Sequence, residues 1–312
     1  MRILVVASYN RNRFAPFILE QATALQRLGN EIDYYGLQGK GLEGYLKNLP
    51  KFKKKIKEFN PDVVHAHFGL SGLFANLQRQ KPVVTTYHGS DINERSLLPF
   101  SKWAMHWSAW NVFVSRQTLE VVHPKRKFSL LPCGIEINEQ QLMGKSEARQ
   151  RMHLAQEKHY VLFAGSYDRD VKNAPLAKEV VGKLTEKNVE LLELKGYSHE
   201  EVIMLMCAVD ALLLTSLNEG SPQVVKEAMA CGCPIVSVDV GDVYERTHGI
   251  EGCYVANTFE SEELAKLLSK ALAFSGKTAG RSRIIEDKLD NKLVAVNLMD
   301  IYREVTRTEK KQ

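Results

Sequence analysis

Short apolar runs rich in β-branched residues alternate with longer segments of helical periodicity along the whole chain. This order of strand, helix, strand and helix is typical of a parallel sheet covered by helices on both faces. The strand candidates of the first half are residues 3–8, 31–37, 61–68, 82–88, 111–115 and 128–134. The helical candidates between them are residues 16–28, 44–59, 70–79, 99–110 and 115–122.

The same alternation then starts again. Strand candidates follow at 160–166, 189–196, 211–216, 234–238 and 253–257, with helical patterns at 174–187, 199–208, 222–231 and 261–274. The chain has 312 residues, which is long for one core and suits two domains. We therefore expect an α/β fold with a first domain over 1–147, a second over 148–312, and a polar linker at 144–159. A long amphipathic tail with no strand after it predicts a final helix at about 290–308 that packs back on the first domain. Ligands of such sheets bind outside the carboxyl ends of the strands.

The composition bears on membrane insertion, secretion and the state of the cysteines. No apolar run reaches the roughly 20 residues that a membrane-spanning helix needs. The opening MRILVVASYN is typical of a first strand, because its apolar run is short for a signal peptide. The five cysteines are odd in number, and the spacing of Cys231 and Cys233 matches neither a zinc site nor a redox pair. We expect reduced thiols, a cytoplasmic protein and no bound metal.

Charge is unevenly distributed. Residues 1–147 carry 20 Lys and Arg against 12 Asp and Glu, while residues 148–312 carry 22 against 25. The basic first half predicts an anionic partner, which can be a phosphate, an acidic glycan or a membrane surface. Neither a recognition-helix signature nor a platform of aromatic and basic residues is present, so no nucleic-acid partner is expected.

The segment 215–237, TSLNEGSPQVVKEAMACGCPIVS, follows an apolar strand candidate. Ser221 is a suitable N-cap, Pro222 suits the first helical position, and Gly232 suits the C-terminal end. These signals predict a helix over 222–231. The free N–H groups at its start form an anion site that can hold a diphosphate without a metal.

Two glutamates flank this expected helix end. Glu219 lies in the loop before the helix, and Glu227 lies more than one turn inside it. A carboxylate can accept two hydroxyl hydrogen bonds, so one can reach a sugar above the phosphate while the other binds a ribose diol. The alternative is that both are solvated side chains, because Glu is usually exposed. The strand, loop and helix around them favour the functional interpretation.

Glu219 and Glu227, with seven residues between them and AMACG-P after them, resemble the E-x7-E signature of retaining glycosyltransferases of family 4 (glycosyl transferases group 1), which have the GT-B fold. The resemblance covers most of the chain, through MRILVV, QATALQRLGNEIDYY, DVVHAHFG, TTYHGSD, FVS, LPCGIE and FAGSYDRDVKN. The segments EGSPQVVKEAMACGCPIVS and YHGSD also resemble enzymes of bacterial capsule and cell-surface polysaccharide synthesis. The resemblance implies two Rossmann-like, doubly wound parallel-sheet domains that face each other across a cleft.

The resemblance also implies roles for individual residues. Glu219 is expected on the donor-sugar hydroxyls, Glu227 on the ribose and Lys172 on the diphosphate. Backbone groups of the next stretch are expected on the sugar and phosphate: Gly220, Ser221, Pro222 and Gln223. The family's arginine after the glycine is replaced by Ser166, so either Arg169 substitutes for it or the contact is absent. A Lys/Arg pair on such a loop suits a clamp for a leaving diphosphate, although loop cations are usually solvated.

Histidines end two strand candidates of the first half. His88 follows PVVTTY, and the resemblance places it beside the transferring sugar; a plain turn histidine is the alternative. Asp91 is expected to orient His88 or to contact the sugar. We expect the side chains of His65 and His67 to point to opposite faces of their strand, which would exclude a two-histidine metal site. His67, nearer the loop, is expected on the acceptor side.

The loop after the first strand departs from the family. The family has a glycine pair there, whereas this chain has SYNRNRF with the basic residues Arg11 and Arg13. These residues could meet an anionic acceptor, or they could narrow the site. The identity of the acceptor is therefore left open.

Residues 47–59 carry six lysines, five of them between positions 51 and 57, beside Phe52, Ile56 and Phe59, which share one helical face. This pattern predicts either a basic amphipathic helix that docks on an anionic membrane or a helix whose apolar stripe faces the core. A second aromatic set at helical spacing, formed by Trp103, Trp107 and Trp110, predicts a buried helix face.

Together these features predict a metal-independent enzyme that transfers a sugar with retention from a nucleotide-diphosphate sugar to a hydroxyl acceptor. The nucleotide-sugar is a substrate, so no cofactor is expected, and the acceptor is expected to be a glycan or a lipid-linked molecule. A peripheral position on the inner face of the cell membrane follows if the basic helix docks there. Two alternatives remain, a sugar-nucleotide epimerase or hydrolase on the same fold and a non-catalytic nucleotide-sugar-binding subunit.

Overall fold

The computed structural model of the chain describes residues 1–10, 12–125 and 127–309. The chain forms two compact units, the first from Met1–Gly134 with Leu289–Gln312 and the second from Ile135–Lys288. The division thus falls after Gly134 and not after residue 147, and the C-terminal helix belongs to the first unit. Residues 145–151 form a helix that packs inside the second unit, so the segment expected to be a linker is part of that unit.

The first unit, unit 1, contains one six-stranded parallel sheet in the order β2-β1-β3-β4-β5-β6. Its strands are β1 (Arg2–Ser8), β2 (Glu31–Leu37), β3 (Val63–His67), β4 (Val83–Tyr87), β5 (Trp110–Phe113) and β6 (Phe128–Leu130). Its helices are α1 (Pro16–Arg27), α2 (Gly41–Leu46), α3 (Leu49–Phe59), α4 (Gly69–Asn76), α5 (Ser90–Asn93), α6 (Leu98–Trp107), α7 (Arg116–Val122) and α15 (Asn291–Glu309). Neighbouring strands of the sheet pair in parallel, and helices connect strands that follow one another in the sequence, as the alternation predicts.

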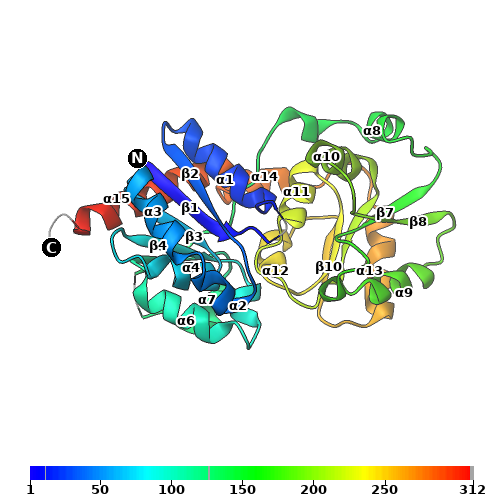
Figure 1. Cartoon of the computed structure of the whole chain (residues 1–312). Helices are drawn as coiled ribbons and strands as arrows, with labels where there is room; N and C mark the ends of the chain where they lie inside the picture. The colour runs from blue at the N-terminus through cyan, green and yellow to red at the C-terminus, as the bar shows by residue number, and fades with distance from the viewer. Residues whose placement is uncertain (11, 126, 310–312) are drawn as a thin grey trace. The chain divides into compact units, whose positions relative to one another are not determined.

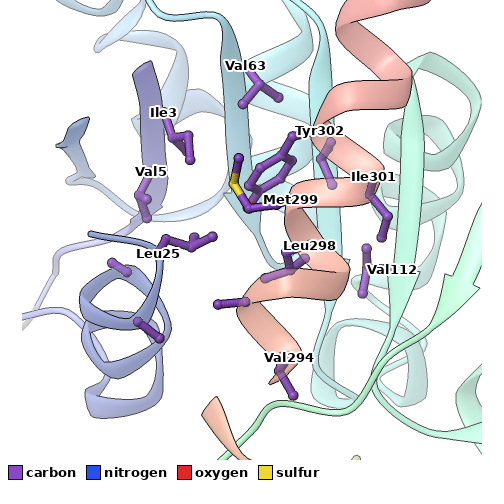
Figure 2. Close-up of a cluster of buried hydrophobic side chains, with 14 of the residues drawn as sticks. Ile3, Val5, Leu25, Val63, Val112, Val294, Leu298, Met299, Ile301 and Tyr302 are labelled. Carbon is purple, nitrogen blue, oxygen red and sulfur yellow. The ribbon is translucent and has the colours of Figure 1, made fainter. Parts of the chain in front are cut away.

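One face of this sheet is covered by α1 and α15 (Figure 1). Val294, Leu298, Tyr302 and Val305 recur three or four residues apart on α15 and are buried against the sheet. Figure 2 shows Leu298 and Tyr302 pointing into the cluster that contains Ile3. Burying each such side chain stabilises the fold by about 1.5–3 kcal/mol. This apolar stripe is what brings the end of the chain back to its first strand.

The opposite face is covered in part by α3. Phe52, Ile56 and Phe59 of α3 are buried, and they pack in a cluster with Leu4 and Val64 from the central strands. The core-facing alternative for residues 47–59 is therefore the one the structure shows. The apolar side chains of α3 are not available for insertion into a membrane.

The prediction of a buried tryptophan face is wrong. The side chain of Trp103 is 58% exposed and that of Trp107 is 36% exposed, because the face of α6 that packs inward carries Ser101, Ala104 and Met105. Trp110 lies outside the helix and begins β5, where its indole N–H donates to Ser129. The helix ends at Trp107, so the three rings do not share one helical stripe.

The second unit, unit 2, contains a five-stranded parallel sheet in the order β11-β10-β9-β7-β8. Its strands are β7 (His159–Phe163), β8 (Val189–Glu193), β9 (Ala211–Leu214), β10 (Ile235–Val238) and β11 (Cys253–Ala256). Its helices are α8 (Lys145–Arg151), α9 (Ala174–Gly182), α10 (His199–Ala208), α11 (Gln223–Cys231), α12 (Val243–Thr247), α13 (Ser261–Ala273) and α14 (Gly280–Glu286), with 3-10 turns at Glu139–Leu142 and Asp170–Lys172.

Helix α11 is held by its inner face. Val225, Ala228 and Met229 are buried, and the helix packs against α10 and α14. Gly232 ends it in the left-handed conformation with φ 68° and ψ 24°, as its position in the sequence predicts. These contacts fix the start of α11 at the carboxyl edge of the sheet, where α11 is the next element after β9 in the sequence. Both sheets are parallel, so the predicted α/β class is confirmed.

Candidate functional site

An ion pair lies at the carboxyl edge of the unit 2 sheet. Lys172 Nζ lies 2.6 Å from Glu219 Oε1. The side chains are 11% and 17% exposed, respectively. Lys172 follows β7 and Glu219 follows β9, which are neighbouring strands of the sheet. The structure therefore brings together two residues that lie 47 positions apart and that the sequence analysis had assigned to the same donor.

The loop that carries Lys172 is anchored along its length. A side chain at Gly165 would place its Cβ 2.7 Å from Lys172 Cγ, so a residue without a side chain is needed there. The Thr215 hydroxyl lies 3.0 Å from the carbonyl oxygens of Lys172 and Asn173, and it donates to them as a shared hydrogen bond. The Leu217 N–H donates to the Val171 carbonyl at 2.9 Å. These contacts join the loops after β7 and β9 and hold the ammonium group in one place.

The start of α11 differs from the sequence prediction by one residue. Pro222 is the N-cap, with φ −66° and ψ 119°, and the helix begins at Gln223. Ser221 does not cap it: its hydroxyl donates to Asp242 Oδ2 at 2.8 Å, beside the Arg246 guanidinium. The N–H groups of Val225 and Lys226 donate to the Pro222 carbonyl, and those of Gln223 and Val224 precede them at the very start of the first turn.

The backbone around Gly220 is closely packed. A side chain at Gly241 would place its Cβ 2.4 Å from the Gly220 carbonyl oxygen. Gly220 is buried, whereas Glu219 and Glu227 are each partly exposed. Glu227 lies four residues after Gln223 and so stands on the same side of α11. The site thus presents two carboxylates, one ammonium group and the first turn of a helix.

The loop residues near the missing family arginine have other partners. The Ser166 hydroxyl donates to Glu193 at 2.9 Å, and the Tyr167 N–H donates to the same Glu193 oxygen at 2.7 Å. Arg169 is exposed, and none of the side-chain contacts recorded over residues 127–309 involves its guanidinium. The structure thus places Lys172 at the site and leaves Arg169 on the loop surface.

Asp91 of unit 1 is enclosed by backbone donors. Its carboxylate accepts the N–H of Gly69 at 2.8 Å and those of His88 and Gly89 at 3.0 Å, and the residue is 2% exposed. Burial raises its pKa to about 6. The arrangement gives Asp91 a structural role, in which it sets the course of the backbone at His88. Direct contact with a sugar, as expected from the sequence, is not favoured by this burial.

The prediction that His65 and His67 point to opposite faces is wrong. Residues two apart in a strand point to the same face. Their ring centroids are 4.4 Å apart, and both side chains are buried. Over the described residues 1–10, 12–125 and 127–309, no group of three or more His, Cys, Asp or Glu side chains could hold a metal ion.

Both histidines belong to a buried polar chain. Tyr302 of α15 lies with its hydroxyl 2.6 Å from His65 Nδ1, and His65 Nε2 lies 2.8 Å from the Thr86 hydroxyl. His67 Nδ1 lies 3.1 Å from His88 Nε2. Burial lowers the pKa of His65 to about 3, and burial with the neighbouring histidines lowers the pKa of His67 well below its usual range. Both rings are therefore neutral at pH 7.

His88 stands at the outer end of this chain and is partly buried. Its Nδ1 lies 3.8 Å from Cys133 Sγ, and its ring packs against Phe17 and Phe68 at 4.8 and 4.6 Å between centroids. In this contact one of the two facing nitrogens donates and the other accepts, so the tautomer of His67 determines whether His88 Nε2 acts as the donor or the acceptor. A sugar hydroxyl that binds the His88 ring must compete with His67 or Cys133.

The two neutral histidines predict acid sensitivity of unit 1. A depressed pKa in the folded state means that the unfolded chain binds protons more readily below pH 6.5. The contribution of these histidines is therefore complete above pH 6.5 and is lost as pH falls from 6.5 towards 3, whereas the raised pKa of Asp91 acts in the opposite direction below about pH 6. His65 alone should lower the free energy of unfolding by about 2 kcal/mol at pH 5.

Urea unfolding at pH 7.5 and pH 5.0, followed by tryptophan fluorescence, checks this prediction, because all three tryptophans lie in unit 1. His65→Gln keeps a donor and an acceptor for Tyr302 and Thr86 and should flatten the pH dependence. His106→Gln, at an exposed position of α6, is the control and should leave it unchanged. An equal pH dependence in all three proteins would contradict the assignment.

The sequence also led to predictions about two arginines of the loop after β1 and about membrane-spanning helices. Arg13 is exposed on the loop after β1. Arg11 lies outside the described residues. Within the described part of the chain, no helix combines the length and the apolar character that crossing a membrane requires.

Sequence reasoning missed several partners. The sequence offered no signal for Tyr302, which lies 237 positions from His65. Glu193 is the last residue of β8 and Asp242 lies in the loop after β10, and a search for polar residues at and after strand ends would have found both. Two parallel α/β units, one of them with a helix that starts after β9 beside a Lys–Glu pair, are the architecture of the GT-B class.

Comparison with known proteins gives the family. Residues 19–139 match the family model described as Glycosyltransferase Family 4, and residues 146–273 match that described as Glycosyl transferases group 1. The chain belongs to this family of glycosyltransferases. The family suspected from the E-x7-E spacing is therefore confirmed.

Two individual relatives share about a quarter of their residues with this chain over the matched regions. TuaC of Bacillus subtilis (strain 168), whose name assigns it to teichuronic acid biosynthesis, is 27% identical over 219 residues, which is 61% of this chain and 56% of TuaC. The match thus spans little more than half of that relative. An uncharacterized glycosyltransferase of Methanocaldococcus jannaschii is 25% identical over 78% of this chain and 71% of its own length.

Solved structures confirm the GT-B fold. Sucrose-phosphate synthase from Thermosynechococcus elongatus superposes with a TM-score of 0.83 at 16% identity, over 99% of this chain and 100% of that one. HepE of Anabaena in complex with UDP-glucose superposes with a TM-score of 0.72 at 15% identity, over the whole of both chains. At these identities the likeness concerns the fold alone.

Proposed function

We propose that this protein transfers a sugar, with retention of anomeric configuration, from a nucleotide-diphosphate sugar to a hydroxyl group of a growing cell-surface polysaccharide or glycolipid. The observation that carries the proposal is the ion pair of Lys172 and Glu219 beside the first turn of α11. An ammonium group and helix N–H groups at one sheet edge are suited to a diphosphate. A carboxylate next to them is suited to sugar hydroxyls.

Each residue of the site is assigned to a part of the donor according to its position. Lys172 and the N–H groups of Gln223 and Val224 neutralise the charge that develops on the departing diphosphate. Glu219 uses one carboxylate oxygen on Lys172 and has a second oxygen that can accept from the donor sugar. Glu227, one turn into α11, accepts from the ribose hydroxyls. This assignment requires no metal ion, because protein groups supply the positive charge.

The names of similar proteins suggest what to test first. HepE has been solved with UDP, glucose and UDP-glucose, so a UDP-hexose is the first donor to try. TuaC is named for teichuronic acid biosynthesis, which supports a cell-surface polysaccharide as the acceptor. We place the reaction on the cytoplasmic side of the membrane, and the absence of disulfides among Cys133, Cys207, Cys231, Cys233 and Cys253 supports this compartment.

The division of roles predicts different defects in two variants. Glu227→Ala should weaken the binding of free UDP, and Glu219→Ala should lower turnover while leaving free UDP binding within about twofold of the parent protein. Each lost hydrogen bond to a charged group corresponds to a factor of about 10 to 100. Calorimetric titration of UDP and a donor-turnover assay in EDTA measure the two effects.

Glu200→Ala is the matched control, since Glu200 is an exposed acid in the first turn of α10 in the same unit. Equal losses of UDP affinity in Glu219→Ala and Glu227→Ala would refute the division. Loss of activity in EDTA with rescue by Mn²⁺ would refute the metal-free mechanism. Epimerised donor, or free sugar released as the only product in the presence of acceptors, would favour an epimerase or a hydrolase.

A further inference from the structure

A basic groove lies beside the end of β2 in unit 1. It has a volume of about 550 Å³ and is lined by Lys40, Lys47 and Lys51 together with Glu43 and the backbone of Gly39 and Gly44. This volume is within the range of ligand pockets. Lys40 lies in the loop after β2, Lys47 follows α2, and Lys51 lies in the first turn of α3. All three lysines are exposed.

Backbone contacts and hydrogen bonds hold the segments that form the groove in place. Gly39 and Gly44 are in backbone contact, and a Cβ at Gly39 would lie 2.7 Å from the Gly44 backbone. Asn10 holds Gly39 from the other side, donating to its carbonyl at 2.9 Å and accepting its N–H at 2.8 Å. The Asn48 amide donates to the carbonyls of Gln38 and Gly44 at 2.8 and 3.1 Å. These bonds keep the lysine-bearing segments together.

The lysines on and beside α3 differ from one another in their pairing, and among the described residues Lys53 and Lys57, outside the groove, also form no ion pair. Lys54 pairs with Glu58 at 3.6 Å, and Lys55 pairs with Asp33. In the described part of the chain, no ion pair is recorded for Lys40 or Lys51, and Lys47 reaches Glu43 at the outer limit of 4.0 Å. The positive charge on this wall is therefore only weakly compensated within the protein, which leaves it available to an anionic ligand.

The groove also has the position expected of a ligand site in such a sheet. It adjoins the carboxyl end of β2, and the loop after β1 supports it through Asn10, which is hydrogen-bonded to the Gly39 backbone. Arg13 of the same loop is exposed. We propose that this groove binds the acidic groups, carboxylate or phosphate, of the glycan that accepts the transferred sugar. This inference rests on the proposed glycosyl transfer and names the chemical class of the acceptor.

A membrane surface is the less favoured occupant. Phe52, Ile56 and Phe59 of α3 are buried in the core, so the helix offers no apolar anchor beside its lysines. The three groove lysines line a concave groove whose lining includes the backbone of Gly39 and Gly44. A flat bilayer meets convex surfaces more easily than it enters a groove, whereas a glycan chain can lie inside one.

Direct binding tests the proposal without any donor. Hexagalacturonate and a terminally phosphorylated mannopentaose serve as acidic probes, with maltohexaose and mannopentaose as neutral probes, in calorimetric titrations of the full chain. We expect binding of at least one acidic probe and weakening of that binding at high salt. The Lys40→Ala/Lys47→Ala/Lys51→Ala variant should bind that probe about tenfold more weakly, as expected for the loss of three exposed charge contacts.

The control is Lys53→Ala/Lys54→Ala/Lys57→Ala, which removes the same amount of charge from α3, outside the groove, and should change the affinity by less than about twofold. Tryptophan-monitored unfolding shows whether each variant is folded. Equal weakening in both triple variants, or equal binding of acidic and neutral probes, would overturn the proposal. Binding to vesicles of anionic lipid but to no acidic glycan would assign the groove to a membrane instead. Because no donor is present, failure here leaves the roles of Lys172 and Glu219 to their own tests.

Discussion

Replacing Lys172 with methionine should lower turnover of the donor by about 100-fold or more, the effect of removing a positioned charge at developing negative charge. Lys172 is 8% exposed, and its aliphatic stem packs against Gly165. Methionine can fill the same space, so the change removes the ammonium group with little effect on packing. Lys172→Arg keeps the charge in a bulkier form and should recover part of the activity.

The measurement must separate catalysis from stability, because Lys172→Met also leaves the Glu219 carboxylate without its partner. The double variant Lys172→Met/Glu219→Gln removes both charges, so it should recover thermal stability without recovering turnover. Lys195→Met is the control, since Lys195 is an exposed lysine of the same unit that pairs with Asp168 at 3.0 Å. Parental turnover in Lys172→Met would show that the ion pair is only structural.

Replacing Asp91 with alanine should destabilise unit 1 by about 4 kcal/mol, because it leaves three buried N–H groups without an acceptor. Each of these groups, on Gly69, His88 and Gly89, now donates to the carboxylate at 2.8 to 3.0 Å. Asp91→Asn should cost less. Its carbonyl oxygen can keep two of the bonds, while its amide meets the third N–H as a second donor.

Urea unfolding followed by tryptophan fluorescence at pH 7.5 measures this loss in unit 1. Asp62→Ala is the matched control, because Asp62 also accepts a backbone N–H, that of Arg2 at 2.7 Å, but at an exposed position. Its expected cost is below about 1 kcal/mol, since water can replace the lost acceptor. If Asp91→Ala kept its stability and lost donor turnover, Asp91 would be a ligand contact after all.

The framework of this site could be predicted from local sequence signals. Helix α11 was expected over 222–231 and runs over Gln223–Cys231, because Gly232 ends it through backbone geometry that adjacent residues determine. The one-residue error at its start has a tertiary cause. Ser221 has the chemistry of an N-cap, but its hydroxyl is taken by Asp242, which lies 21 residues away.

Pairings between distant elements could not be predicted in the same way. The error over His65 and His67 was one of reasoning, since two-residue spacing places both rings on one face. Their connection to Tyr302 was not available from the sequence at all, because it depends on α15 packing on the sheet of unit 1. The exposed ring of Trp103 shows the converse, a helical spacing of aromatic residues that does not mark a buried face.

The sequence by itself therefore determined the class of fold, the two parallel sheets and the order of loops at their carboxyl edges. These features depend on residue periodicity and on caps, which act over a few neighbouring positions. Only the tertiary structure decided that Lys172 meets Glu219, that Asp91 is enclosed by backbone donors, and that α3 directs its phenylalanines inward and leaves a groove of lysines. Each of these outcomes depends on which surfaces are buried against each other. The hydrophobic effect is non-directional, so a local sequence pattern does not specify which distant surface an apolar face will contact.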